Sequence, residues 1–79
     1  MVEIRQHGEA FEVIGPGGYY EVFDGKLRAL LAAVGYASRR ACILLRDVHI
    51  LVPRDWGSTI IVTLAQAQSV AQREATSAA

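Results

Sequence analysis

The chain has 79 residues, 52% of them hydrophobic and 20% charged, and its formal net charge is zero. We expect one domain, residues 1–79, with a thin core, because so short a chain buries only somewhat more than half of its unfolded surface. No run approaches the roughly 18 apolar positions of a membrane span, and the first residues lack the features of a signal peptide. A single cysteine, Cys42, allows no internal disulfide. These features predict a cytoplasmic protein with no membrane segment.

Charge is distributed unevenly along the chain. Residues 1–25 contain five acidic residues and one arginine, a net of −4, whereas residues 26–79 contain seven basic and three acidic residues, a net of +4. Seven of the eight basic residues are arginine, which favours two-point pairing with carboxylate or phosphate. Either the two halves attract each other, within one fold or between copies, or the basic half contacts an acidic partner. The arginine bias also fits a bacterial or phage gene.

The first 25 residues alternate apolar and polar side chains, as do strands of an antiparallel sheet with one wet face. A first strand begins at Val2, and the GPGG tetrad at 15–18 reverses the chain between two more strands. We therefore expect a three-stranded meander. Its covered face would carry Ile4, Phe11, Val13, Tyr20 and Val22. Its open face would carry Glu3, Arg5, Glu12 and Glu21.

Two short helices are predicted after the meander. The first has apolar residues at helical spacing that would cover the sheet, namely Leu27, Leu30, Leu31 and Val34. Asp24 is placed to cap this helix, and Gly35 follows where a helix commonly ends. Ser38 can cap a second helix that runs to about Arg46.

The rest of the chain contains a fourth strand and a segment with two interpretations. Residues 48–52 are continuously apolar and predict a strand that Pro53 ends or confines to a sheet edge, before a loop at 54–57. From Ser58, apolar residues at helical spacing predict a C-terminal helix, although residues 59–63 are β-branched enough to pair as a strand with residues 48–52. The tail from about Ala75 should fray. The predicted fold class is α+β: a three-stranded antiparallel meander, two short helices, a fourth strand and a C-terminal helix.

Residue types that could support catalysis are present but scattered. The glycines at 15–18 lie between strands and lack the lysine and hydroxyl of a phosphate-binding loop, so they predict a hairpin turn. Cys42 has apolar neighbours and is expected in the core, and the predicted elements give Asp47 and His49 no reason to converge on it. His7 and His49 lack the spacing of zinc ligands. We therefore expect no metal, no cofactor and no enzymatic activity.

Seven residues are candidate partner-binding positions: Arg39, Arg40, Arg46, Arg54, Trp56, Tyr19 and Phe23. Arg39 and Arg40 would open the second helix, where cations oppose the helix dipole, so helix stability does not explain them. We favour pairing of these arginines with the acidic meander. The alternative is a helix-turn-helix with the 48–64 segment as a wing, in which Arg39, Arg40, Arg46 and Arg54 contact DNA.

The aromatic candidates suggest protein contact rather than nucleic acid. By alternation, Tyr19 and Phe23 fall on the outer face of the meander, where the neighbouring glutamates repel phosphate. Trp56 is either a lid on the core or an interface anchor.

The predicted function is binding of another macromolecule, most simply a protein, by a small non-catalytic bacterial or phage protein. A winged-helix-like DNA-binding transcriptional regulator is the alternative, and a small enzyme ranks third. We also expect a homodimer, because one short chain cannot bury all of its apolar residues, and the 48–52 strand is apolar on both faces. Strand edges or C-terminal helices would pair across a two-fold axis.

Overall fold

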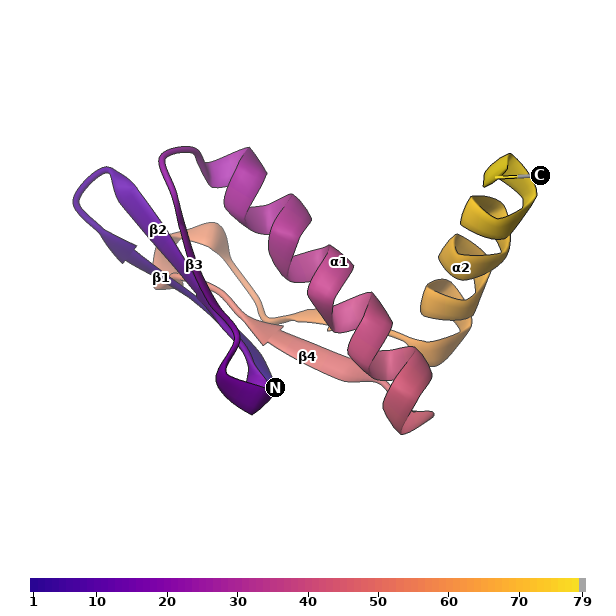
Figure 1. Ribbon diagram of the computed structural model, residues 1–79. Coiled ribbons are helices and arrows are strands. Elements are labelled where there is room, and N and C mark those ends of the chain that lie inside the picture. The colour runs from indigo at the N-terminus through magenta and orange to yellow at the C-terminus, as the bar shows by residue number, and fades with distance from the viewer. Residues whose placement is uncertain (79) are drawn as a thin grey trace.

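The computed structural model describes the backbone of residues 1–78 and the side chains of residues 1–73. The strands are β1 (Val2–His7), β2 (Ala10–Ile14), β3 (Tyr20–Phe23), β4 (Val48–Leu51) and β5 (Ile60–Val62). The α-helices are α1 (Lys26–Leu44) and α2 (Leu64–Ala78), and short 3-10 turns span Pro16–Gly18 and Arg54–Trp56. One mixed sheet has the order β3-β2-β1-β4-β5, and α1 crosses one of its faces (Figure 1). The α+β class is confirmed, with five strands and two α-helices instead of four strands and three helices.

The predicted meander is present, because β2 pairs antiparallel with both β1 and β3. The face assigned to β3 is wrong. Phe11 opposes Phe23 and Glu12 opposes Val22, so Phe23 shares the covered face while Tyr20 and Val22 lie on the open face. Both alternating sets of residues in this segment contain large apolar side chains, and alternation alone therefore does not fix the phase of the strand.

The β2–β3 connection is held against α1. Gly17 and Gly18 both have positive φ, 76° and 82°, which the tight turn requires and which other residues rarely adopt. The Tyr36 hydroxyl donates a hydrogen bond to the carbonyl of Pro16. A side chain at Gly15 would overlap the Tyr36 ring, so this glycine permits the close approach of turn and helix.

Residues 26–44 form one continuous helix, which corrects the prediction of two. Gly35 and Ser38 both lie in its interior, and neither ends or begins a helix. Asp24 makes no cap and instead lies 3.8 Å from Arg28, one turn along. The helix ends at Leu45, which takes the left-handed conformation with φ 54° and ψ 45°. Within residues 26–44 there is thus no turn of the kind that a helix-turn-helix needs.

Small side chains of α1 form its contact with the sheet. Ala29, Ala33, Ala37 and Ala41 follow one another at intervals of four and are all completely buried. Of the four residues predicted to cover the sheet, Leu27 and Leu31 are exposed. Leu30 and Val34 are half-buried and pack against the core. The sheet supplies the larger core side chains, Val2, Ile4, Phe11, Val13, Val48, Ile50 and Val62. Alanine methyl groups let the helix approach closely enough for these side chains to fill the space beneath it.

The fourth strand is internal and is buried on one side only. β4 pairs parallel with β1, through Val2 and Ile50, and antiparallel with β5. Val48 and Ile50 are buried whereas His49 and Leu51 are exposed, so a single chain covers one face of this strand. Residues 60–62 form β5, which confirms the alternative strand interpretation and contradicts a helix beginning at Ser58.

The C-terminal helix begins later than predicted, at a reciprocal cap. The Gln66 amide N–H donates to Thr63 Oγ1 at 3.1 Å, and the Thr63 N–H donates to Gln66 Oε1 at 3.0 Å. The Leu64 N–H donates to Asp47 Oδ1 at 2.9 Å. This hydrogen bond joins the start of α2 to the residue that immediately precedes β4. The fraying expected from about Ala75 concerns residues whose side chains lie outside the described part of the chain.

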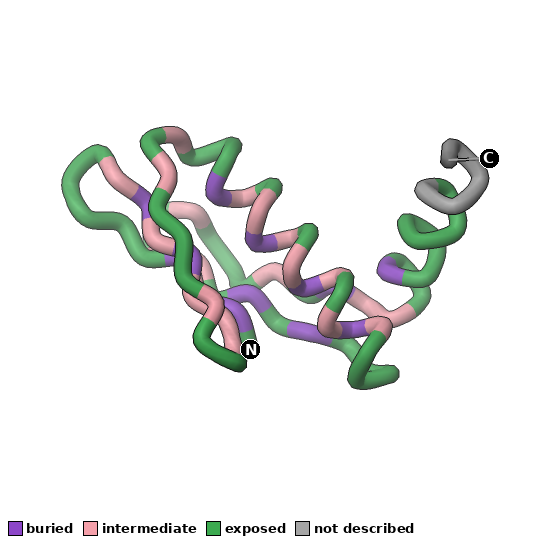
Figure 2. The backbone as a smooth tube through the Cα atoms, in the orientation of Figure 1, coloured by how far each residue is buried: buried purple, intermediate pink, exposed green. Residues whose placement is uncertain are grey.

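The fold is elongated, with extents of 41 × 24 × 24 Å. α2 packs beside α1 near its own first turns and then diverges from it (Figure 1). Most of α2 between residues 64 and 73 is not buried (Figure 2), and Ala67 is the one buried residue in this range. Among the described residues, neither α-helix combines the length and apolar character needed to cross a bilayer.

Candidate binding surfaces

A pocket of about 250 Å3 lies between the end of α1 and the start of β4. Its lining residues are Met1, Pro16, Arg40, Leu44, Arg46, Asp47, Val48 and His49. Arg40 reaches it from the last turns of the helix, and Arg46 from the turn that follows Leu45. The continuous helix therefore brings two of the predicted arginines to one cavity, which we call the arginine pocket.

The guanidinium groups of the arginine pocket have no carboxylate partner among the side chains that the structure describes. Arg40 and Arg46 form no ion pair with a carboxylate among residues 1–73. The Nε of Arg40 is buried and has no hydrogen-bond acceptor there. The carboxylate of the pocket, Asp47, already accepts the Leu64 N–H. A buried donor without an acceptor is unfavourable, so the pocket is suited to a ligand that supplies one.

The favoured pairing of arginines with the acidic meander is not formed within residues 1–73. The ion pairs there join Arg5 to Glu3, His7 to Glu12 and Arg28 to Asp24. Arg39 is exposed on another side of α1, and Arg54 is exposed in the turn at 54–56. Since α1 is one helix, Arg39 and Arg40 lie toward its C-terminal end and do not oppose the dipole.

The three aromatic candidates are half-buried parts of the fold. Tyr19 stacks on Tyr36 of α1, with ring centroids 4.1 Å apart and an interplanar angle of 7°. Phe23 packs against the core. Trp56 covers Phe11 at a centroid distance of 5.6 Å, and the Lys26 ammonium lies 4.7 Å above the indole. The outer-face placement of Tyr19 and Phe23 is therefore corrected, and Trp56 lies over the core as a lid.

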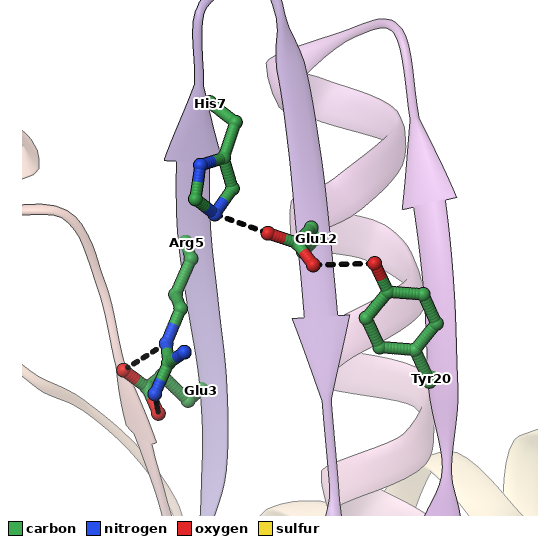
Figure 3. A network of polar contacts seen from close by, with 5 residues as sticks. All are labelled: Glu3, Arg5, His7, Glu12 and Tyr20. Carbon is green, nitrogen blue, oxygen red and sulfur yellow. Dashed lines mark hydrogen bonds and ion pairs between the residues drawn. The ribbon is translucent and has the colours of Figure 1, made fainter.

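The open face of the sheet carries polar side chains that contact one another (Figure 3). Glu12 forms an ion pair with His7 and accepts a hydrogen bond from the Tyr20 hydroxyl. The Nε of Arg5 lies 3.0 Å from Oε2 of Glu3. The hydrogen bond to Glu12 raises the pKa of Tyr20 above 10.0. The side chains of Glu3, Arg5, His7, Glu12 and Tyr20 are therefore paired with one another. None of these five groups requires a ligand as its partner.

A groove of about 480 Å3 separates α1 from α2. Large apolar residues line it, Leu31, Val34 and Ile43 from α1 and Val70 from α2, together with the smaller Gly35, Ser38, Cys42, Ala67 and Ala71. Arg39 lies at the same groove. The spacing of the leucines signalled this surface in the sequence, but it was assigned to the contact with the sheet. Cys42 lines this groove, is half-buried and packs against the edge of the core.

The residue types of a thiol catalyst do not come together. Cys42 lines the groove, whereas Asp47 and His49 line the arginine pocket. Within the described residues, no three His, Cys, Asp or Glu side chains are grouped closely enough to hold a metal ion. The chain matches no protein-family model, no curated protein and no solved structure. Its function is therefore inferred from these surfaces.

Proposed function

We propose that this chain is a non-catalytic protein of a bacterium or phage that acts in the cytoplasm by binding an acidic segment of another protein. The observation that carries the proposal is the arginine pocket, where Arg40 and Arg46 face one cavity without carboxylate partners from residues 1–73. Guanidinium groups bind carboxylates through paired, charge-assisted hydrogen bonds. The buried Nε of Arg40 would gain an acceptor when such a group enters.

The surroundings of the pocket favour a protein over DNA. Leu44 and Leu45 beside it are exposed apolar residues, whereas nucleic-acid interfaces are strongly basic and polar. Asp47 lines the same cavity and would repel a phosphate backbone more than a single well-placed carboxylate. A partner segment with an acidic side chain next to an apolar one fits both features. DNA binding through the same arginines is the competing outcome of the test below.

We expect the functional form to be a homodimer. Among the described residues, eleven large hydrophobic side chains are exposed. Three of them, Leu27, Leu31 and Ile43, lie on one side of α1, and a contiguous exposed apolar patch is typical of proteins that associate. The dimer places the partner-binding pocket in two copies on one assembly, which would raise the avidity for a partner with repeated acidic segments.

The test is capture of the partner from a lysate of the organism that carries the gene, with and without nuclease. We compare the wild-type protein with an Arg40→Gln/Arg46→Gln variant. Arg54→Gln is the matched control, because Arg54 is an exposed arginine that does not line the pocket. The double variant should bind a purified partner about 100-fold more weakly, since each charge-assisted hydrogen bond contributes roughly 1.5–3 kcal/mol. Arg54→Gln should bind like the wild type.

Two outcomes contradict the proposal. If nuclease abolishes capture, and duplex DNA shows a mobility shift that falls steeply with salt and is lost in the double variant, the chain is a DNA-binding protein. If Arg54→Gln weakens binding as much as the double variant, general positive charge and not the pocket is responsible. Circular dichroism of each variant verifies that the fold is intact.

A further inference from the structure

α1 is apolar on two opposite sides. Its inner side is the row of buried alanines that meets the sheet. Its outer side carries Leu27, Leu31 and Ile43, which are 66%, 63% and 69% exposed. We call these three residues, with Gly35 and Arg39 between them, the outer stripe, because all five repeat at intervals of four along the helix. All of the outer stripe except Leu27 lines the groove beside α2, and α2 leaves these residues exposed. An apolar stripe on a helix is normally buried against another element.

Gly35 lies at the centre of the outer stripe, and the fold of one chain does not require it. A side chain built at this position would meet nothing within 4 Å. Glycine inside a helix is nevertheless less favourable than alanine, because it loses more backbone entropy on folding. A glycine here is explained if another backbone approaches the helix closely at this point.

The exposed area of the chain points in the same direction. The accessible surface is 5340 Å2, whereas a compact monomer of 8.6 kDa exposes about 4,700 Å2. The excess of roughly 600 Å2 is comparable to the area of roughly 800 Å2 that each partner buries in a standard interface. The groove between α1 and α2, where α2 diverges from α1, is part of this exposed surface (Figure 1).

We propose that a second copy of this chain covers the outer stripe, with the two α1 helices crossing at Gly35 on a two-fold axis. This inference rests on the homodimer of the proposed function and identifies its interface. In an antiparallel crossing, residues equally far from Gly35 oppose one another, so Ile43 meets Leu27 of the partner subunit and Arg39 lies over Leu31 of the partner subunit. The stem of Arg39 can pack there while its guanidinium reaches water. The same surface is used by both copies, so the assembly closes as a dimer.

Charge does not oppose this arrangement. Of the other basic residues of α1, Lys26 lies over Trp56, Arg28 pairs with Asp24 and Arg40 lines the arginine pocket. An acidic partner protein is a poorer occupant of the stripe, because Arg39 is its sole charged residue. The outer stripe thus presents mainly apolar side chains, and raising the salt concentration should not dissociate the dimer.

Gly35→Ala tests the crossing because it should change two measurements in opposite directions. In dilute solution, where the protein is monomeric, the variant should unfold at a higher urea concentration than the wild type, as alanine favours helix. At low micromolar concentration, light scattering after size exclusion should give a wild-type mass of twice 8.6 kDa. The variant should need about tenfold more protein to dimerise, because its methyl group separates the helices.

A matched pair of charge substitutions distinguishes the helices from the sheet. Leu31→Glu should raise the dissociation constant of the dimer by at least tenfold, roughly the effect of losing a central interface residue. Ile61 is 51% exposed, against 63% for Leu31, and lies on the open face of the sheet opposite His49, so Ile61→Glu should leave the dissociation constant unchanged. The Cys42 thiol in the groove provides a readout independent of mass. It should react more slowly in the dimer than in diluted protein.

A monomeric wild type overturns the proposal, as does a dimer that dissociates with Ile61→Glu but not with Leu31→Glu. If Gly35→Ala stabilises the fold without weakening the dimer, the crossing point is wrong. The dimer test and the partner-binding test can fail independently. Arg40 and Arg46 lie outside the outer stripe, so the Arg40→Gln/Arg46→Gln variant should keep the mass of a dimer even if it loses the partner.

Discussion

The inner and outer sides of α1 differ in a way that reverses the usual surface helix. The inner side buries four alanines completely, whereas the outer side exposes two leucines and an isoleucine. In most surface helices the largest apolar residues face the core. Here the sheet fills the core with its own valines, isoleucines and a phenylalanine, and the residues of α1 that are completely buried above it are alanines. The comparison teaches that Leu27, Leu31 and Ile43 contribute little to the packing of a single chain.

The largest expected effect comes from adding volume to the inner side. Ala33→Leu should destabilise the protein by about 2 kcal/mol or more, because a completely buried alanine faces a filled core and the helix must move away from the sheet. Urea unfolding of the dilute protein measures the change. The control is Leu31→Ala on the outer side, where the side chain is mostly in water. It should change stability by less than about 0.5 kcal/mol. Equal effects on the two sides would refute the comparison.

The alanine row also explains how much of the fold could be predicted. Alternation located β1, β2 and the covered side chains Ile4, Phe11 and Val13 correctly. Of the four residues predicted to cover the sheet, Leu30 and Val34 pack against the core whereas Leu27 and Leu31 are exposed. Periodicity shows which residues share a face but does not show where the centre of the buried face lies. Four alanines at intervals of four were visible in the sequence, yet leucine has the stronger transfer free energy and dominated the assignment.

The end of α1 and the start of α2 were predicted incorrectly for different reasons. Gly35 resembled a helix end, whereas the true end, Leu45, carries no glycine signal. For α2, Thr63 and Gln66 form a capping box that is readable in the sequence and marks where β5 must already have finished. For the arginines, the residue type indicated pairing with an anion. That Arg40 and Arg46 share a pocket while Arg39 and Arg54 lie elsewhere depends on tertiary structure, which no local pattern contains.

A change in stability of intermediate size is expected at Leu45, the residue that ends α1. Leu45 holds a left-handed conformation, which is unfavourable for a residue with a branched side chain, and its side chain is 70% exposed. Leu45→Gly should therefore stabilise the dilute protein by about 1 kcal/mol. The urea midpoint should rise with an unchanged dependence on urea. Leu44→Gly, one residue earlier and still helical, is the control and should destabilise instead. A loss of stability with Leu45→Gly would mean that this leucine packs in the native state.

The smallest expected effect is a difference in pKa between Tyr19, which stacks against α1, and Tyr20, which lies on the open face of the sheet. The pKa of Tyr19 is raised above 10.0 first by burial and then by its hydrogen bond to Glu21, whereas the hydrogen bond to Glu12 is the main cause for Tyr20. Both shifts favour the protonated phenol in the folded state. Their contribution to stability is therefore complete below about pH 10 and is lost as the pH rises through the folded-state pKa values.

Titration of phenolate absorbance measures this difference in two variants. Glu12→Gln removes the charged acceptor of Tyr20, so the pKa of Tyr20 should return close to its ordinary value. Glu21→Gln should lower the pKa of Tyr19 only in part, because the stacking on Tyr36 still shields the ring from water. Tyr20→Phe and Tyr19→Phe assign each step of the titration to its residue. If Glu21→Gln returned the pKa of Tyr19 fully to its ordinary value, the hydrogen bond to Glu21 and not burial against α1 would be the main cause of the shift. The contact between Tyr19 and α1 would then be more open to water than the stacking of Tyr19 on Tyr36 indicates.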